Sequence, residues 1–460
     1  MDRYSKKEFI SFLIMARGSL EETKYHLLLA KDLGYLKEDI YNNFKCNYVL
    51  LGKKINSLIS SISKKMNSKA NNQQPVFSYG RQTIDDDDIA AVIAALKSDW
   101  LTQGPAVQNF ENALVQKFGG RYATAVANGT AGLHLIAMAL GWKKDDVVIT
   151  SPITFLASAN CAVYVGATPT FVDIEKSTYT IDPNKLEDKL KQYSAQNKKI
   201  KAVVAVDYAG NPCNWEALKS LKEKYGFQLV NDYCHALCAE YKNDLKYAPN
   251  YADAVNLSFH PVKHITTGEG GAVLTNDKTV DMHIKTLRTH GITKDENILE
   301  KNDGPWYYEM HEIGFNYRIT DFQCALGISQ LKKIDSFIEK RRLIAKYYDN
   351  FFCNDARFII PGVSKDSKHA YHLYPLQIKF DELQISKKDF FAKMKKNNIS
   401  LQVHYVPVHL QPFYRKNYGF KVGDFPIAEK FYEREISIPV YPSLRVEDLI
   451  YITETILENL

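Results

Sequence analysis

The sequence predicts an α/β fold preceded by an α-helical hairpin, and two patterns support this prediction. From residue 77 onward, short apolar runs alternate with helix-like segments, which is typical of a mostly parallel sheet covered by helices. Before residue 64, apolar residues recur at three- and four-residue steps, as they do in amphipathic helices. The chain has 460 residues, 45% hydrophobic and 24% charged, so its composition is globular and its length suits two or three domains.

The apolar runs after residue 77 place the expected strands at 147–150, 170–173, 202–206, 228–230, 254–259 and 271–275. Helices are expected between them, for example at 131–140 and 214–225. A long helix at 331–352 then leads into strands expected near 371–378 and 401–405. We therefore expect a large α/β domain at 77–330, with a mixed and mostly parallel sheet, and a smaller C-terminal α+β domain at 331–460.

Residues 1–63 are predicted to form the helical hairpin, and the polar residues 64–76 are predicted to form a linker. The second helix carries a sustained apolar stripe made of Ile40, Phe44, Tyr48, Leu51, Ile55, Leu58 and Ile62. Two helices alone cannot bury such a stripe. We therefore expect the hairpin to need a partner, such as the same hairpin from a second copy, which would complete four helices.

The formal net charge of +6 is concentrated at the N-terminus. Residues 1–75 contain 13 Lys or Arg and 7 Asp or Glu, and the rest of the chain contains 46 of each. The neutral body has no bulk attraction for nucleic acid, so a nucleic-acid partner is not expected there. For the basic hairpin, a solvated helix face is the simpler interpretation, and RNA binding is the alternative.

Several features favour a cytoplasmic protein without a membrane segment. The polar start lacks a signal peptide, and no apolar run reaches the roughly 18 residues needed to span a bilayer. The seven cysteines are scattered, which suits reduced thiols. Cys234 and Cys238 have no second pair nearby to complete a zinc site, so no metal is expected.

Lys263 is the first candidate for chemistry. It follows an apolar strand in the segment Ser258–Phe259–His260–Pro261–Val262–Lys263 and precedes the glycine-rich turn at 266–272. Burial lowers the pKa of a lysine, which makes the amine available to form a Schiff base. The glycines allow the backbone to approach a ligand closely. On its own this pattern also fits an ordinary exposed lysine.

Two other segments supply what pyridoxal 5′-phosphate (PLP) requires. Gly129, Thr130 and Ala131 open an apolar helix, and free N–H groups at a helix start bind phosphate; the alternative is an ordinary helix cap. Asp232 ends an apolar strand, where a buried carboxylate can keep the cofactor's ring nitrogen protonated. His235 follows three residues later and is either a cofactor contact or a structural histidine.

The order of these motifs, from the Gly-Thr loop through the aspartate to Ser-Phe-His-Pro-x-Lys, resembles the DegT/DnrJ/EryC1/StrS family of PLP-dependent sugar aminotransferases. The resemblance covers residue 77 to the C-terminus and implies a fold type I transferase in which Lys263 carries PLP and Asp232 pairs with its ring nitrogen. It also implies that His235 lies beside the phenolic oxygen and Phe155 against the ring. The phosphate contacts it implies are Gly129, Thr130, Ala131, Ser258 and, from the neighbouring subunit of a homodimer, Asn316.

Further segments resemble the branch of this family that aminates a sugar nucleotide in pseudaminic-acid biosynthesis. They are residues 79–84, 98–105 and 403–414. This resemblance implies L-glutamate as amino donor, released as 2-oxoglutarate, and C4 of a UDP-linked 4-keto-6-deoxy-N-acetylhexosamine as acceptor. Thr102, His404 and Tyr405 are the implied substrate contacts. Arg318 is a further candidate, because a guanidinium binds carboxylate or phosphate bidentately, although it equally fits an interface salt bridge.

Three alternatives remain open from the sequence. The acceptor could be another nucleotide-linked 3- or 4-keto sugar. A related sugar dehydratase has a histidine in place of the cofactor lysine, and Lys263 argues against it. A protein of a different class, a non-catalytic regulator or binding partner built on the same scaffold, is possible because folds outlive their chemistry.

The hairpin itself resembles the four-helix-bundle family encoded by intervening sequences of bacterial ribosomal RNA genes. The matching segments are 16–22, 30–35 and 51–55, and the resemblance covers about residues 5–63. Only half of a bundle is present, which again implies assembly through the hairpin into an oligomer larger than the dimer.

Overall fold

The computed structural model describes residues 6–67 and 75–460, and the chain divides into two compact units. The first unit is formed by Met1–Val76 together with Arg445–Asn459, and the second by Phe77–Leu444 with the terminal Leu460. Within the described residues, all the strands belong to the second unit.

In the first unit, α1 (Lys6–Asp32) and α2 (Glu38–Asn67) confirm the predicted helices at the N-terminus. The turn between them depends on Gly34, which adopts a left-handed φ of 78°. The N–H of Tyr35 then bonds back to the carbonyl of Ala30 at 2.8 Å and closes the end of α1. The same unit contains α16 (Val446–Glu458).

The hairpin buries little apolar surface. Among its described side chains, only Leu20 and Ile59 are buried. Leu20 of α1 packs over Gly52 of α2, where a Cβ would stand 3.4 Å from Cδ2 of Leu20, an ordinary contact distance. The predicted stripe on α2 is left between 42% and 45% exposed at Ile40, Phe44, Leu51 and Leu58. The side chain of Ile62 lies outside the described residues.

The second unit is built on a seven-stranded sheet in the order β2-β9-β8-β6-β5-β3-β4. The strands from β8 to β4 are parallel, and β9 is antiparallel to both of its neighbours, which confirms the mixed, mostly parallel sheet. Their bounds are β2 Tyr122–Val126, β3 Val147–Thr150, β4 Thr168–Phe171, β5 Ala202–Val206, β6 Gln228–Asp232, β8 Ala254–Ser258 and β9 Gly271–Thr275.

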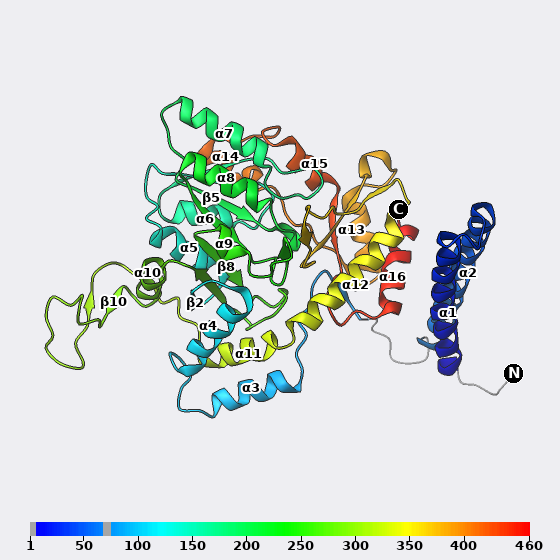
Figure 1. Cartoon of the computed structure of the whole chain (residues 1–460), viewed down its shortest axis with the longest axis horizontal. Helices are drawn as coiled ribbons and strands as arrows, with labels where there is room; N and C mark the ends of the chain where they lie inside the picture. Colours follow the sequence, from blue (N-terminus) through cyan, green and yellow to red (C-terminus); the bar gives the residue numbers. More distant parts are fainter. Residues whose placement is uncertain (1–5, 68–74) are drawn as a thin grey trace. The chain divides into compact units, whose positions relative to one another are not determined.

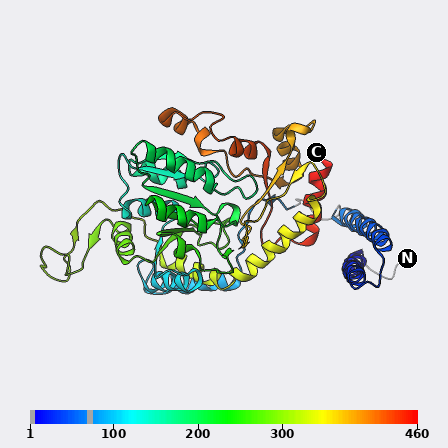
Figure 2. The ribbon, with the colours of Figure 1, turned by 45° about the horizontal axis from the view of Figure 1, so that its top comes forward.

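Helices cover both faces of this sheet (Figures 1 and 2). Alternate strand residues point to opposite faces, so Val203 and Ala205 join one core while Ala202 and Val204 join the other. The first core includes residues of α4 (Pro105–Phe118), α7 (Pro183–Ala195), α8 (Trp215–Tyr225) and α11 (Asp321–Leu331). The second includes residues of α5 (Gly129–Ala139), α6 (Ala157–Tyr164) and α10 (Lys278–Arg288). The remaining α-helices between residues 77 and 330 are α3 (Asp86–Leu96) and α9 (Ala248–Tyr251), and a short 3₁₀ helix, η1, spans Tyr208–Gly210.

Beyond α11, the long α12 (Ile334–Phe352) leads to a three-stranded antiparallel sheet in the order β12-β14-β16. Its strands are β12 Phe358–Ile359, β14 Tyr374–Ile378 and β16 Glu435–Ile438. Further elements are α13 (Lys387–Lys396), α15 (Pro426–Arg434) and the short pairs β1 (Phe77–Ser78) with β15 (Ile399–Ser400) and β7 (Glu240–Tyr241) with β13 (Ser367–Lys368). By contrast, α14 (Pro412–Tyr418) packs against the large domain, where Tyr414 contacts Phe171 of β4 and bonds to Asn160 of α6.

The segment 401–405, which was expected to be a strand, forms no ladder. Only Gln402 makes a bridge, to Ser437. The backbone N–H of His404 instead donates to the side chain of Glu435, at 3.0 Å. A strand ladder is lost here because a buried carboxylate replaces the neighbouring carbonyl as acceptor.

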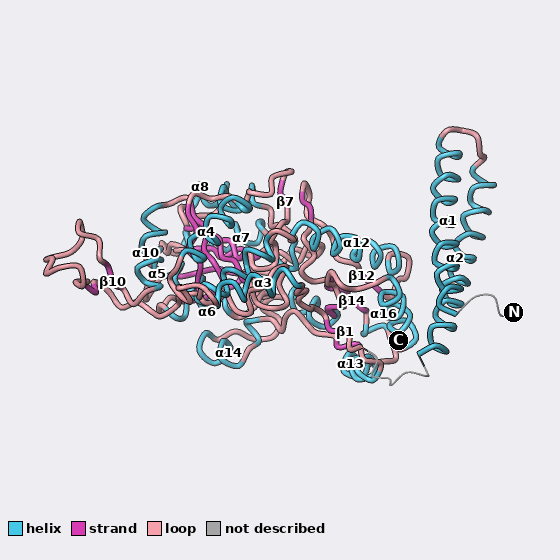
Figure 3. Tube along the Cα trace, turned by 90° about the horizontal axis from the view of Figure 1, so that it is seen from below, coloured by secondary structure: helices cyan, strands magenta, loops and turns pink. Residues whose placement is uncertain are grey.

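An arm follows α10 and projects from the body of the second unit (Figures 1 and 3). It contains the short pair β10 (Ile292–Thr293) and β11 (Glu309–Met310). Large apolar side chains on it are strongly exposed, including Trp306 at 73%, Met310 at 64% and Ile313 at 76%. The arm therefore presents a strongly exposed apolar surface.

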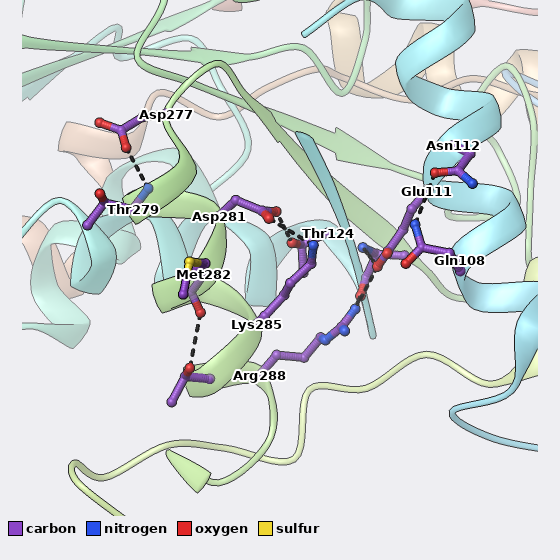
Figure 4. A network of polar contacts seen from close by, with 12 residues as sticks. Gln108, Glu111, Asn112, Thr124, Asp277, Thr279, Asp281, Met282, Lys285 and Arg288 are labelled. Carbon is purple, nitrogen blue, oxygen red and sulfur yellow. Dashed lines mark hydrogen bonds and ion pairs between the residues drawn. The ribbon is translucent and has the colours of Figure 1, made fainter. Parts of the chain in front are cut away.

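A polar network fixes the helix from which the arm departs (Figure 4). Arg288 pairs with the buried Glu111 at 2.8 Å and donates to the carbonyl of Ala125 at 2.6 Å. Thr124 donates to Asp281 at 2.7 Å. These contacts tie α10 to β2 and α4, so the base of the arm has a defined position.

Candidate active site

A cavity of about 940 Å³ opens where the parallel strands β6 and β8 end and α5 begins. The end of a parallel strand next to a helix start is the usual ligand position in α/β folds. Ten of the residues singled out in the sequence line this one cavity: Gly129, Thr130, Ala131, Phe155, Asp232, His235, Ser258, Lys263, His404 and Tyr405.

The start of α5 forms an anion-binding cradle. The first-turn N–H groups of a helix have no intrahelical acceptor, and the Asn128 side chain occupies only that of Ala131, at 2.8 Å. Those of Gly129 and Thr130 remain for a ligand. A Cβ on Gly129 would stand 3.0 Å from Cβ of Ser258, a tight contact, so glycine favours the close approach of the helix start to the end of β8.

Asp232 ends β6 and is held by a buried hydroxyl relay. Ser158 donates to its Oδ2 at 2.6 Å, and Thr154 lies 2.7 Å from the same serine hydroxyl. Because the single hydrogen of Ser158 goes to the carboxylate, Thr154 must be the donor to Ser158. The remaining contacts of the carboxylate, from Cys234 N–H and Asn256 Nδ2, are long at 3.4 and 3.5 Å. Asp232 therefore presents an oriented acceptor to the cavity.

Lys263 lies in a turn just beyond β8, and its Nζ is 3.3 Å from Nε2 of His372. Burial lowers the pKa of Lys263, and Cys234 and Asp232 partly oppose this effect. Burial also lowers the pKa of His372 well below its usual value, so this imidazole is neutral. The pairing keeps the amine oriented and readily deprotonated, as a nucleophile or base requires.

His235 and Tyr405 form a second polar pair in the cavity. Nδ1 of His235 accepts the N–H of Ala209 at 3.3 Å, and burial lowers the pKa of His235 well below its usual value. The ring is therefore neutral with its hydrogen on Nε2, which donates to the Tyr405 hydroxyl at 3.1 Å. The ring of Phe155 lies 6.0 Å from that of Tyr405 and is 54% exposed.

Three of the residues singled out in the sequence do not line the cavity. Thr102 makes a bridge to Thr320, and Asn316 makes one to Thr289. Arg318 also lies outside it, although its neighbour Tyr317 lines it. Within a single chain these side chains do not complete the site.

Two residues of the site had no distinguishing pattern in the sequence. His372, which lines the cavity, is 109 residues from Lys263 along the chain, and Ser158, which holds Asp232, is 74 residues from it, so neither contact leaves a local motif. Tyr79, from the segment 79–84 noted in the sequence, and Cys234 also line the cavity. Among the described residues, no group of side chains could hold a metal ion, and no helix is both long and apolar enough to cross a bilayer.

The fold and the cavity define an α/β enzyme with a lysine at its centre. The model of the DegT/DnrJ/EryC1/StrS aminotransferase family matches residues 82–457, and the chain belongs to this family. It is a PLP-dependent aminotransferase. The model of the 23S rRNA-intervening sequence protein family matches residues 1–57.

The chain is also similar to individual proteins of this family. The UDP-4-amino-4,6-dideoxy-N-acetyl-β-L-altrosamine transaminase of Campylobacter jejuni (serotype O:23/36, strain 81-176) is 39% identical over 383 residues, which are 83% of this chain and 96% of that protein. The solved Helicobacter pylori aminotransferase of pseudaminic-acid biosynthesis has a TM-score of 0.75 and 34% identity, covering 84% of this chain and 99% of that one. A Streptococcus pneumoniae protein assigned as a sugar aminotransferase, solved in its PLP form, has a TM-score of 0.73 and 27% identity, covering 85% and 100%.

The residues present fit PLP. The cradle at Gly129 and Thr130 suits its phosphate, and the oriented carboxylate of Asp232 suits its ring nitrogen. Lys263 provides the amine, with its pKa lowered by burial.

Proposed function

We propose that this protein transfers an amino group from L-glutamate to C4 of a UDP-linked 4-keto-6-deoxy-N-acetylhexosamine, in the biosynthesis of pseudaminic acid or a related cell-surface sugar. The observation that carries the proposal is the single cavity that joins Lys263 and Asp232 to the segment around His404 and Tyr405. The relatives from Campylobacter jejuni and Helicobacter pylori support the choice of sugar through the activities that their names state.

PLP, when bound, withdraws electrons from the substrate carbon that loses its proton. Lys263 removes that proton and returns it to the neighbouring position, because its amine lies in the cavity and burial lowers its pKa. Asp232, fixed by Ser158, would hold the cofactor's ring nitrogen in its positive form. The start of α5 and Ser258 would bind its phosphate, and Phe155 would lie against its ring. The sugar nucleotide then receives the amine through the same proton transfers in reverse.

The decisive assay incubates the purified protein with glutamate and a panel of UDP- and dTDP-linked 4-keto and 3-keto sugars, and measures 2-oxoglutarate release. We expect turnover with the UDP-linked 4-keto sugar and none in the Lys263→Ala variant. Turnover only with another keto sugar would correct the substrate. A protein that binds PLP but turns over no member of the panel would favour the non-catalytic alternative.

The second proposal concerns the homodimer: each site is completed by the other subunit. Two observations support it. Asn316 and Arg318 do not line the cavity of their own chain. They follow the arm in the sequence, and the arm carries large exposed apolar side chains. The scattered cysteines, which suit reduced thiols, support a cytoplasmic location for this chemistry.

A complementation experiment tests the shared site. Lys263→Ala and Asn316→Ala chains, each inactive or weakened alone, are co-expressed. If Asn316 acts across the interface, the mixed dimer has one intact site, and activity recovers to about one quarter of the wild type by random pairing. No recovery, although mixed dimers are isolated, would show that Asn316 acts in its own subunit.

The third proposal is that the hairpin pairs with the hairpin of a second copy. By the 3.6-residue period, the exposed stripe of α2 lies on one side of Gly52, and Lys54 lies at the far edge of the stripe. A two-fold axis parallel to the helices would lay α1 of each copy on α2 of the other. It would bury both stripes.

Deletion of residues 1–70 tests this assembly. We expect the dimer and its activity to remain while a larger species disappears in light scattering. A truncated chain that loses the dimer would contradict the proposal. Salt-sensitive binding of RNA by the full chain, absent from the truncated chain, would instead support the RNA alternative.

A further inference from the structure

The segment of the cavity wall around His404 is held by two side chains of β16 that do not reach the cavity themselves. Glu435 accepts the N–H of His404 through Oε2 at 3.0 Å. Ser437 lies 2.8 Å from Nδ1 of His404 and donates to Oε1 of Glu435 at 2.6 Å. Glu435 and Ser437 are fully buried, and His404 lines the cavity, where its ring packs 4.6 Å from that of Tyr79.

The hydrogen bonds from Glu435 through Ser437 to His404 determine which ring nitrogen of His404 carries the hydrogen. An ionised carboxylate only accepts, so the one hydrogen of Ser437 points to Glu435. Toward His404 the serine oxygen can then only accept, and the hydrogen must lie on Nδ1. Burial lowers the pKa of His404 to about 3, so the ring is neutral and its Nε2 carries a bare lone pair. No side chain among the described residues is bonded to this Nε2.

A bare lone pair selects between the two substrates. The groups that glutamate presents away from the reacting amine are carboxylates, which are themselves acceptors and would be repelled. The sugar nucleotide offers neutral donors, namely its hydroxyls and the N–H of its acetamido group. The lone pair of His404 therefore suits the sugar and has nothing to accept from glutamate.

Protonation of Glu435 can reverse the direction of the hydrogen bonds from Glu435 through Ser437 to His404. Burial raises its pKa to about 7, against the opposing charge of Lys387 on α13. The other titratable groups around it are His404 and the tyrosines Tyr179, Tyr208 and Tyr405. When Glu435 is protonated it can donate to Ser437, which then donates to Nδ1 and moves the hydrogen of His404 to Nε2. Nε2 of His404 then changes from an acceptor to a donor.

Resting on the proposed function, we propose that Glu435 and Ser437 are positioning residues that hold Nε2 of His404 as an acceptor for a hydroxyl or amide N–H of the sugar nucleotide. Protonation of Glu435 reverses this polarity and weakens recognition of the sugar. Neither residue touches substrate; both act through His404.

The two half-reactions provide the test, because each is followed separately by the absorbance change of the bound cofactor in a single turnover. In Ser437→Ala we expect kcat/KM for the UDP-linked keto sugar to fall about 10-fold, mainly through KM. The glutamate half-reaction should stay within about 2-fold. Ser437→Thr keeps the hydroxyl and should restore the sugar half-reaction. Equal slowing of both half-reactions, or no change in either, would refute the relay.

The pH dependence of kcat/KM tests the effect of Glu435 protonation independently. In the wild type, kcat/KM for the sugar should rise as pH increases through about 7, where Glu435 ionises. This rise should be absent from the glutamate half-reaction and from Glu435→Gln. A rise that persists in Glu435→Gln would assign it to another group and overturn the switch.

The histidine form can be observed without any turnover. In ¹⁵N-histidine-labelled protein, with His404 assigned by its loss in His404→Asn, Nε2 should be unprotonated at pH 8 and protonated at pH 6, on either side of the Glu435 pKa. A protonated Nε2 at pH 8 would refute the inference. A wild type inert toward glutamate would refute the proposed function, and this measurement would still decide the relay.

Discussion

Replacing Ser158 with alanine removes the one short hydrogen bond to Asp232. The bond joins two buried side chains at 2.6 Å, and the other contacts of the carboxylate are 3.4 Å or longer. A hydrogen bond to a charged group contributes about 1.5–3 kcal/mol. If that energy holds the carboxylate against the cofactor's ring nitrogen, its loss weakens PLP binding and slows the glutamate half-reaction roughly 10- to 160-fold at 1.36 kcal/mol per factor of ten.

The assay titrates cofactor-free protein with PLP and then mixes the complex with glutamate, following absorbance in both steps. Thr154→Val is the matched control, because it removes the outer hydroxyl of the relay and leaves the Ser158–Asp232 bond in place. We expect this control to change either quantity by less than about 3-fold, since it removes only a neutral hydrogen bond. The reasoning fails if Ser158→Ala stays within 2-fold of the wild type, or if both variants are equally impaired.

Three other predictions concern stability. Asp207→Asn should lower the free energy of unfolding by about 2–4 kcal/mol in chemical denaturation, because the buried carboxylate accepts four hydrogen bonds and an amide would turn donors toward donors; a change below 0.5 kcal/mol would contradict it. Lys263→Met should raise the melting temperature of the cofactor-free protein at pH 7.5, because burial lowers the pKa of Lys263 and the fold opposes its charge. This gain should shrink as pH approaches 10.5, where the lysine of the unfolded chain also loses its proton. A gain that grows with pH would contradict a lowered pKa of Lys263 in the folded protein. Gly132→Ala should cost about 1–3 kcal/mol, since its Cβ would stand 2.3 Å from Oδ1 of the buried Asn256, whereas Gly18→Ala, with open space, should not destabilise.

The fold was largely predictable because its strands are buried on both faces. Runs such as 202–206 have no room for polar residues, and they appear as β5 with every residue buried. The prediction was wrong at 401–405, where the extended backbone bonds to the Glu435 side chain, a partner that no periodicity reveals. The long helix expected at 331–352 is present as α12 and begins three residues later, at Ile334, because α11 ends at Leu331 and a short turn separates the two helices. The apolar spacing continues across this turn, so it did not reveal the boundary.

Residues of the cavity could be predicted from the sequence where a reactive side chain directly follows an apolar strand. Lys263 and Asp232 each follow an apolar run, and strand ends meet at one edge of a parallel sheet. Ser158, His372 and Glu435 could not be found this way, because they reach the site through tertiary contacts over long chain separations. We propose the roles of the individual residues, such as that of Asn316, from the resemblance to the family. The linker at 64–76 and the domain boundary at 330 are likewise proposals.

The central claim is that Lys263 carries PLP. The most direct measurement reduces the PLP-loaded protein with borohydride, which makes the bond between lysine and cofactor permanent, and locates the added mass by peptide mass spectrometry. We predict that the pyridoxyl group is found on the peptide containing Lys263 and that prior treatment with glutamate abolishes the label. A label on another lysine, or none on the wild type after PLP addition, would contradict the account.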